Sequence, residues 1–172
     1  MRYASYLVPG GELTVVTDNS LIGDLGETSY GAVVSATYRG LDDALDRLPD
    51  ALQAPQVAAL PEIASAISRY LDGDLAALGD VSVWQLGGPF QQLAWAALRT
   101  IPPGTVDTYA GLAARAGRPR AYRAAGTACS SNMVALFIPC HRVVASHGIG
   151  GYGYGLDAKR ALLDHEDADL RR

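Results

Sequence analysis

A cysteine with two potential cations beside it is the residue best suited to chemistry in this chain. Cys140 follows Pro139 and precedes His141 and Arg142. A free thiol has a pKa of about 8.5, and a neighbouring imidazolium or guanidinium lowers it toward neutral pH, where the thiolate is nucleophilic. A buried structural cysteine is the alternative, but such a thiol does not ordinarily lie between proline and two cationic side chains. The sequence therefore favours Cys140 as a reactive thiol.

The residues before this cysteine predict how it is positioned. Residues 135–138 form a short apolar run that is typical of a buried strand. Pro139 fixes its own φ and favours extended geometry at Ile138. We therefore expect Cys140 at the rigid end of a buried strand.

Arginine is concentrated in the same part of the chain. Six arginines lie between residues 99 and 142, against Asp107 as the one acidic residue. The whole chain has a net charge of −4, but a polyanion responds to the local field, whose range is about 8–10 Å in physiological salt. Guanidinium groups bind phosphate in bidentate fashion. The stretch indicates a phosphate-binding surface, with a solvated basic surface as the alternative.

Two short helices are predicted within this stretch, over residues 109–116 and 120–130, with Gly117-Arg118-Pro119 between them. This pattern is typical of a helix-turn-helix, although many helical hairpins bind no nucleic acid. One face of the second helix carries only small residues, which permits close approach to a groove or to another helix: Ala121, Ala124, Ala125, Gly126 and Ala128. Arg123 favours the groove, because a long cation on this helix reaches outward.

The remaining sequence predicts the elements that hold these features. The composition changes near residue 85, so we expect an N-terminal domain of residues 1–84 and a C-terminal domain of residues 85–172. The first domain is expected to contain strands and helices over residues 3–8, 13–17, 31–38, 41–48 and 61–71. A further helix begins near Pro89 and ends before Pro102-Pro103-Gly104.

Composition limits the class of protein. The 172 residues are 49% hydrophobic and 19% charged, which excludes a disordered or fibrous chain. No apolar run reaches the roughly 18–20 residues of a membrane span, and the N-terminus is unlike a signal peptide. Two cysteines, Cys129 and Cys140, form no disulfide framework. We therefore expect a cytoplasmic protein.

The run Ile138-Pro139-Cys140-His141-Arg142-Val143-Val144 resembles the active-site signature of the O6-alkylguanine-DNA alkyltransferases, also called methylated-DNA–protein-cysteine methyltransferases. The resemblance spans roughly residues 88–166. It includes further segments in the family's order: Gly88-Pro89-Phe90-Gln91, Trp95, Ile101-Pro102, Gly104, Tyr109, Arg123-Ala124-Ala125-Gly126, Asn132, Gly150–Tyr152, Leu162-Leu163 and His165-Glu166.

The resemblance implies an α+β fold. A small N-terminal α/β domain, RNase H-like with an antiparallel sheet, would precede an all-α winged-helix-like domain that contains the helix-turn-helix. It also implies direct, irreversible and stoichiometric transfer of an alkyl group from O6 of guanine in double-stranded DNA. The resemblance leaves open whether the same transfer takes place from O4 of thymine. No cofactor is expected, and residues 1–98 contain no Cys or His for a zinc site.

The resemblance also implies catalytic roles. Cys140 would accept the alkyl group, and His141 would deprotonate it through a water molecule. Glu166 would orient that histidine, as in a nucleophile–base–orienter triad. Asn132 would brace the cysteine loop, and Tyr109 would help to flip the nucleotide and protonate the leaving guanine.

DNA contacts are implied for the second helix, which lies in the minor groove in this family. Arg123 would fill the space left by the flipped base. Other positions assigned to the DNA surface are Arg118, Arg120, Ala121, Tyr122, Ala124, Gly126 and Thr127. The base pocket is assigned to Cys129, Val143, Tyr152, Gly153 and Tyr154. A monomer is expected.

This sequence departs from the family pattern at several positions, among them Tyr122, which is bulkier than the alanine frequently found there. Met133 follows Asn132 where proline is usual, Gly153 replaces a frequent serine, and Tyr154 adds bulk. Three other classes of protein are the alternatives. A non-catalytic sensor of alkylated bases would lack Cys140, and a helix-turn-helix regulator would need an effector or dimerisation module. A cysteine hydrolase would have no use for Arg123.

Overall fold

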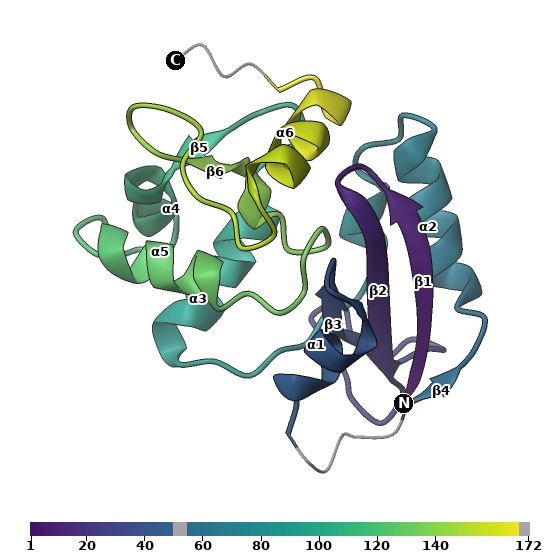
Figure 1. Cartoon of the computed structure of the whole chain (residues 1–172). Helices are drawn as coiled ribbons and strands as arrows, with labels where there is room; N and C mark the ends of the chain where they lie inside the picture. Colours follow the sequence, from purple (N-terminus) through teal and green to yellow (C-terminus); the bar gives the residue numbers. More distant parts are fainter. Residues whose placement is uncertain (50–54, 169–172) are drawn as a thin grey trace. The chain divides into compact units, whose positions relative to one another are not determined.

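The computed structural model describes residues 1–49 and 55–168. It divides into two compact units, one formed by Met1–Gln85 with Met133–Phe137, the other by Leu86–Asn132 with Ile138–Arg172. The order of strands and helices makes this an α+β protein, with a mixed sheet in the first unit (Figure 1). Among the described residues, no helix is long and apolar enough to cross a membrane.

The sheet of the first unit has the strand order β3-β2-β1-β4. Strands β1 (Arg2–Val8) and β2 (Gly11–Asp18) form a hairpin across Pro9 and Gly10, and β3 (Ala32–Thr37) pairs antiparallel with β2. The two-residue β4 (Gln56–Val57) pairs with β1 in parallel. The prediction of an antiparallel sheet is therefore wrong at this edge, because β4 follows a helix and not a tight hairpin turn.

Helices cover the sheet and complete the core of the first unit. Helix α1 (Gly40–Asp46) places Ala44 in an apolar cluster with Val16 and Val34 of the strands. Helix α2 (Pro61–Leu71) has proline in its first turn and buries one face: Ile63, Ala66, Ile67 and Tyr70. A 3₁₀-helix, η2 (Ala77–Asp80), follows.

The apolar run before the cysteine does not form the predicted strand. Only Val134 makes a bridge, parallel to Ala36 of β3, and the Ala36 N–H donates to the Met133 carbonyl at 2.8 Å. The chain then turns at Leu136, whose φ is +70°. The strand prediction over residues 135–138 is wrong. An apolar run indicates that residues are buried but not which conformation they adopt, and these residues are buried in a turn.

The second unit contains four α-helices among its described residues: α3 (Pro89–Arg99), α4 (Tyr109–Arg115), α5 (Tyr122–Ser130) and α6 (Leu156–His165). Helices α3, α4 and α5 pack side by side (Figure 1). The indole N–H of Trp95 on α3 donates to the Ala128 carbonyl of α5 at 2.9 Å. This buried hydrogen bond fixes α5 against α3. The two helices predicted over residues 109–116 and 120–130 are present as α4 and α5.

A small parallel pair joins β5 (Asp107–Thr108) to β6 (Val143–Val144). The prediction of an all-α second domain is wrong in this respect. The extended backbone of β6, which follows the cysteine motif, pairs with β5 just before α4. The motif itself forms the 3₁₀-helix η3 (Cys140–Arg142). Cys140 therefore lies on a tight helical turn and not at the end of a strand.

Replacing Gly31 with alanine is expected to destabilise the first unit by about 2–6 kcal/mol. Gly31 has φ of +72°, and an added Cβ would lie 1.9 Å from the Asp18 carbonyl oxygen. Left-handed geometry costs about 1–3 kcal/mol outside glycine, and overpacking adds about 1–3 kcal/mol. Urea denaturation measures the loss.

Gly26 provides the matched control. Its φ is +86°, but an added Cβ would meet no atom within 4 Å. Gly26→Ala should therefore incur only the conformational cost, and equal losses in the two variants would contradict the close approach at Gly31.

Candidate active site

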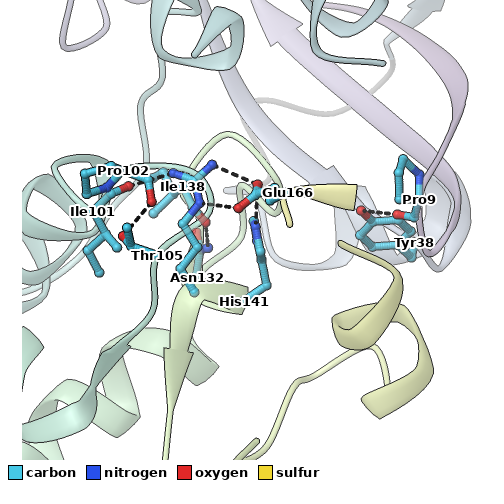
Figure 2. Close-up of polar contacts among 10 residues, drawn as sticks. Pro9, Tyr38, Ile101, Pro102, Thr105, Asn132, Ile138, His141 and Glu166 are labelled. Atoms are coloured by element: carbon cyan, nitrogen blue, oxygen red, sulfur yellow. Dashed lines mark hydrogen bonds and ion pairs between the residues drawn. The ribbon is translucent and has the colours of Figure 1, made fainter. Parts of the chain in front are cut away.

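The Cys140 thiol is buried and held by one side chain. Cys140 is 8% exposed, and the Asn132 Nδ2 donates to its Sγ at 3.2 Å. The same Nδ2 donates to the Ile138 carbonyl at 2.8 Å (Figure 2). Burial raises the pKa of Cys140, while the Asn132 hydrogen bond and the charge of Lys159 lower it in part. The resting form is therefore the thiol, with a donor already placed to stabilise the thiolate.

Beside the cysteine, a second network joins η3 to the end of α6. His141 Nε2 and Glu166 Oε1 lie 3.0 Å apart, and Figure 2 shows the two side chains pointing toward each other. Arg142 donates to both Glu166 oxygens, from Nε and Nη2, at 2.8 Å each. Its Nη1 donates to the Ile101 carbonyl at 2.7 Å. Arg142 is thus committed to the carboxylate and is not the cation that acts on the thiol.

This network fixes the protonation states. His141 and Arg142 lower the pKa of Glu166 to about 2, although burial alone would raise it. Burial lowers the pKa of His141, so its imidazole is neutral at pH 7. Glu166 only accepts hydrogen bonds, so the imidazole proton lies on Nε2. The buried Nδ1, which has no hydrogen-bond partner among the described residues, is therefore the basic nitrogen.

A buried lysine supports the site and was missed by the sequence analysis. Lys159 Nζ donates to the Val143 carbonyl at 2.6 Å and to the Gly151 carbonyl at 3.1 Å. Burial lowers its pKa to about 8. The side chain thus ties β6 to the loop before α6 and places a positive charge near the thiol. Its position on the apolar face of α6, between Ala158 and Leu162, was the available signal.

The Cys140 thiol opens into a cavity of about 180 Å³. The lining residues include six of the predicted site residues and two others: Tyr109, Gly126, Cys129, Cys140, Tyr152 and Gly153, with Ser130 and Gly151. Val143 and Tyr154 are not among them. Val143 is buried, and its carbonyl accepts a hydrogen bond from Lys159. The Tyr154 ring packs edge-on against the Tyr152 ring, with 5.5 Å between the ring centres.

Tyr109 contributes a hydroxyl to this cavity from the first residue of α4. Thr108 caps that helix, since its Oγ1 accepts from the Gly111 N–H at 3.0 Å. Burial raises the pKa of Tyr109, and the thiolate charges of Cys129 and Cys140 raise it further. The phenol is therefore protonated at pH 7 and can serve as a donor.

Helix α5 has different surroundings on its different sides. Ala125 and Ala128 are buried, whereas Tyr122, Arg123, Ala124 and Thr127 are exposed and Ala121 is half-buried. The Arg123 guanidinium lies 5.6 Å from the centre of the Tyr122 ring. Arg118 and Arg120, in the turn before the helix, are exposed. The small residues therefore do not form one surface: part of them packs inward, and the outward side carries the cation.

Replacing Glu166 with glutamine is expected to lower the free energy of unfolding by about 3–5 kcal/mol at pH 7, because the buried Arg142 guanidinium loses its carboxylate. The pKa of Glu166 is about 2 in the folded chain, against an ordinary value of 4.5. The contribution is thus complete above about pH 4.5 and is lost as the pH falls toward 2. Denaturation at pH 7 and at about pH 3 measures both effects.

Asp164→Asn is the matched control, since Asp164 is an exposed carboxylate in the last turn of α6, two residues before Glu166. It should change stability by no more than about 0.5 kcal/mol. An equal loss in both variants would contradict the role assigned to the buried pair.

Comparison with known proteins identifies the family. Residues 89–168 match the family model described as "6-O-methylguanine DNA methyltransferase, DNA binding domain". The chain is 43% identical over 111 residues to the methylated-DNA–protein-cysteine methyltransferase of Methanosarcina barkeri, covering 64% of this chain and 70% of the relative. Its identity to the enzyme of the same name from Mycobacterium bovis is 36% over 152 residues, 87% of this chain and 90% of the relative.

A solved structure is similar over nearly the whole length. The crystal structure of Mycobacterium tuberculosis OGT in complex with DNA superposes with a TM-score of 0.72 and 31% sequence identity, covering 96% of this chain and 93% of the other. With the Cys140 site already defined, these matches show that the chain belongs to the methylated-DNA–protein-cysteine methyltransferase family.

Proposed function

We propose that this protein repairs DNA by transferring the alkyl group from O6 of guanine to Cys140, once per chain. The observation that carries the proposal is the buried Sγ of Cys140, which is hydrogen-bonded to Asn132 and opens into a cavity with the Tyr109 phenol. The names of the relatives and the DNA complex of the similar structure support the same reaction. Transfer of an alkyl group from O4 of thymine to Cys140 would extend the proposal to a second base.

The proton of Cys140 goes to His141. The lone pair on the imidazole Nδ1 is buried, and a bridging water is the means by which such an atom reaches a nearby thiol. Glu166 stabilises the imidazolium that forms, because its carboxylate lies 3.0 Å from Nε2. The Asn132 N–H and the charge of Lys159 stabilise the thiolate.

The transfer itself is a displacement at carbon. The Cys140 sulfur attacks the alkyl carbon, the bond from that carbon to O6 breaks, and its electron pair remains on guanine. Tyr109 donates a proton to the guanine and regains one from solvent. The thioether product is stable, and no described residue of the cavity is suited to remove the alkyl group, so each chain reacts once.

DNA binding is assigned to α5 and the turn before it. O6 of a stacked guanine lies inside the duplex, so the base must leave the stack to reach the cavity. The exposed Arg123 fills the vacated space, and Arg118 and Arg120 contact phosphates. The surface that faces the minor groove is formed by Ala121, Tyr122, Ala124 and Thr127. Gly126, on the same helix, belongs to the lining of the cavity.

The finer architecture belongs to the same proposal. Residues 1–84 form an RNase H-like domain, supported by the order β3-β2-β1-β4 with β4 parallel to β1. Residues 85–172 form the winged-helix-like alkyltransferase domain, supported by α4 and α5. The protein acts as a cytoplasmic monomer. The presence of Cys140 argues against a non-catalytic sensor.

Incubation with duplex DNA that carries O6-methylguanine is expected to add one methyl group per chain, at Cys140. Peptide mass spectrometry locates the group, and Cys140→Ser should accept none. Methylation at Cys129 with Cys140 unmodified would contradict the assignment.

Replacing Arg123 with alanine is expected to slow repair of duplex DNA by about 10–100-fold, because flipping the base costs a few kcal/mol. Reaction with free O6-benzylguanine requires no flipping and should slow by less than threefold, or about 0.6 kcal/mol. Arg160→Ala removes an exposed arginine from α6 and serves as the matched control. Equal slowing of both reactions by Arg123→Ala would refute the role of Arg123.

A further inference from the structure

A second thiol lines the cavity that receives the alkyl group. Cys129 comes from α5 and Cys140 from η3, and both side chains contribute to the same cavity wall. Both cysteines are free thiols. The proposed transfer uses only Cys140, so a nucleophilic group lies beside the acceptor without a role in it.

The two thiols affect each other. Burial raises the pKa of Cys129, and the charge of a Cys140 thiolate raises it further, while Lys159 lowers it. Cys129 is therefore a thiol while Cys140 is reactive, and it does not compete for the first alkyl group. Once Cys140 is a thioether, its charge no longer raises the pKa of Cys129, although burial still does and Lys159 still lowers it. Cys129 is then the remaining thiol in the lining of the cavity.

We propose that Cys129 is the second acceptor for bifunctional alkyl groups, those whose far carbon carries a leaving group. The inference rests on the proposed function, because it requires prior transfer to Cys140. Its substrate class is O6-(2-haloethyl)guanine in DNA. Transfer of such a group leaves a 2-haloethyl thioether on Cys140, which is itself an alkylating agent.

The closing reaction is balanced without any further reagent. The Cys140 sulfur displaces chloride from the far carbon, which gives a three-membered episulfonium ring. The Cys129 sulfur attacks a ring carbon, the ring C–S bond to that carbon breaks, and its electron pair returns to the Cys140 sulfur. The thiol proton of Cys129 passes to solvent, so the net loss is HCl. The product is an ethylene bridge between the two sulfurs.

Proximity and nucleophile type favour this closure over the competing reactions. Groups held in a suitable orientation react with effective concentrations of about 10⁵–10⁸ M, which no external nucleophile reaches. The other side chains of the cavity that could attack are the hydroxyls of Tyr109 and Ser130. Both are poorer nucleophiles than sulfur at neutral pH. Closure also consumes an electrophile that would otherwise react with water or DNA.

The test uses the full chain and a duplex that carries O6-(2-chloroethyl)guanine. Trypsin leaves Cys129 and Cys140 in one peptide, since no Lys or Arg lies between Arg123 and Arg142, and cyanogen bromide then cuts after Met133, between the two cysteines. The bridged product stays joined after this cut and after reduction, which distinguishes it from a disulfide. We expect at least about tenfold more bridged product than 2-hydroxyethyl product on Cys140.

Cys129→Ser is the matched variant. It should yield 2-hydroxyethyl-Cys140 or a Cys140–DNA cross-link, with no bridge. The inference is overturned if the unaltered chain gives these same products and leaves Cys129 free.

Methyl transfer from O6-methylguanine is measured in parallel for both proteins. It distinguishes a failure of the proposed function from a failure of the role proposed for Cys129. No methylation of Cys140 in the unaltered chain would overturn the proposed function. Normal methylation without a bridge would overturn only the role of Cys129. For the variant, bridge formation is expressed per methyl-competent chain, so a general loss of activity is not mistaken for loss of closure.

Discussion

A buried ion pair between Arg142 and Glu166 is the interaction on which the site depends. Burying a carboxylate is costly unless it is paired and fully hydrogen-bonded, and here both of its oxygens accept from Arg142 while one also faces His141. Arg142 extends the pairing to the Ile101 carbonyl after α3. The end of α6, the η3 turn and the end of α3 are thereby held together, and His141 is fixed in one tautomer.

Helix α5 joins recognition to chemistry because its sides have three different environments. Ala125 and Ala128 pack inward, where the Ala128 carbonyl accepts the hydrogen bond from Trp95. Gly126 and Cys129 line the cavity, and Arg123 is exposed. A short helix can do this because successive residues are displaced around its axis, so neighbouring positions point to different surroundings. In the proposed function, the same helix therefore displaces the base and forms the wall that receives it.

Local pattern predicted the elements of this protein well where one residue type dictates the backbone. Pro61 and Pro89 lie in the first turns of α2 and α3, and the hairpin turns at Pro9 and Gly10. It failed where an apolar run could be buried in more than one conformation, as in the turn at Leu136. It also missed the parallel edge strand β4, because pairing direction depends on the path of the chain between strands.

The sequence by itself determined which reactive groups exist and how far apart they lie along the chain: a thiol after proline, an imidazole beside it, and a carboxylate at residue 166. Only the tertiary structure decided which charges meet. The arginine next to His141 turns to Glu166, and the cation near the thiol is Lys159, a residue of α6. The reason is physical: spacing along the chain determines which residues share a face of one helix, whereas ion pairing between elements depends on packing, which brings together residues distant in sequence.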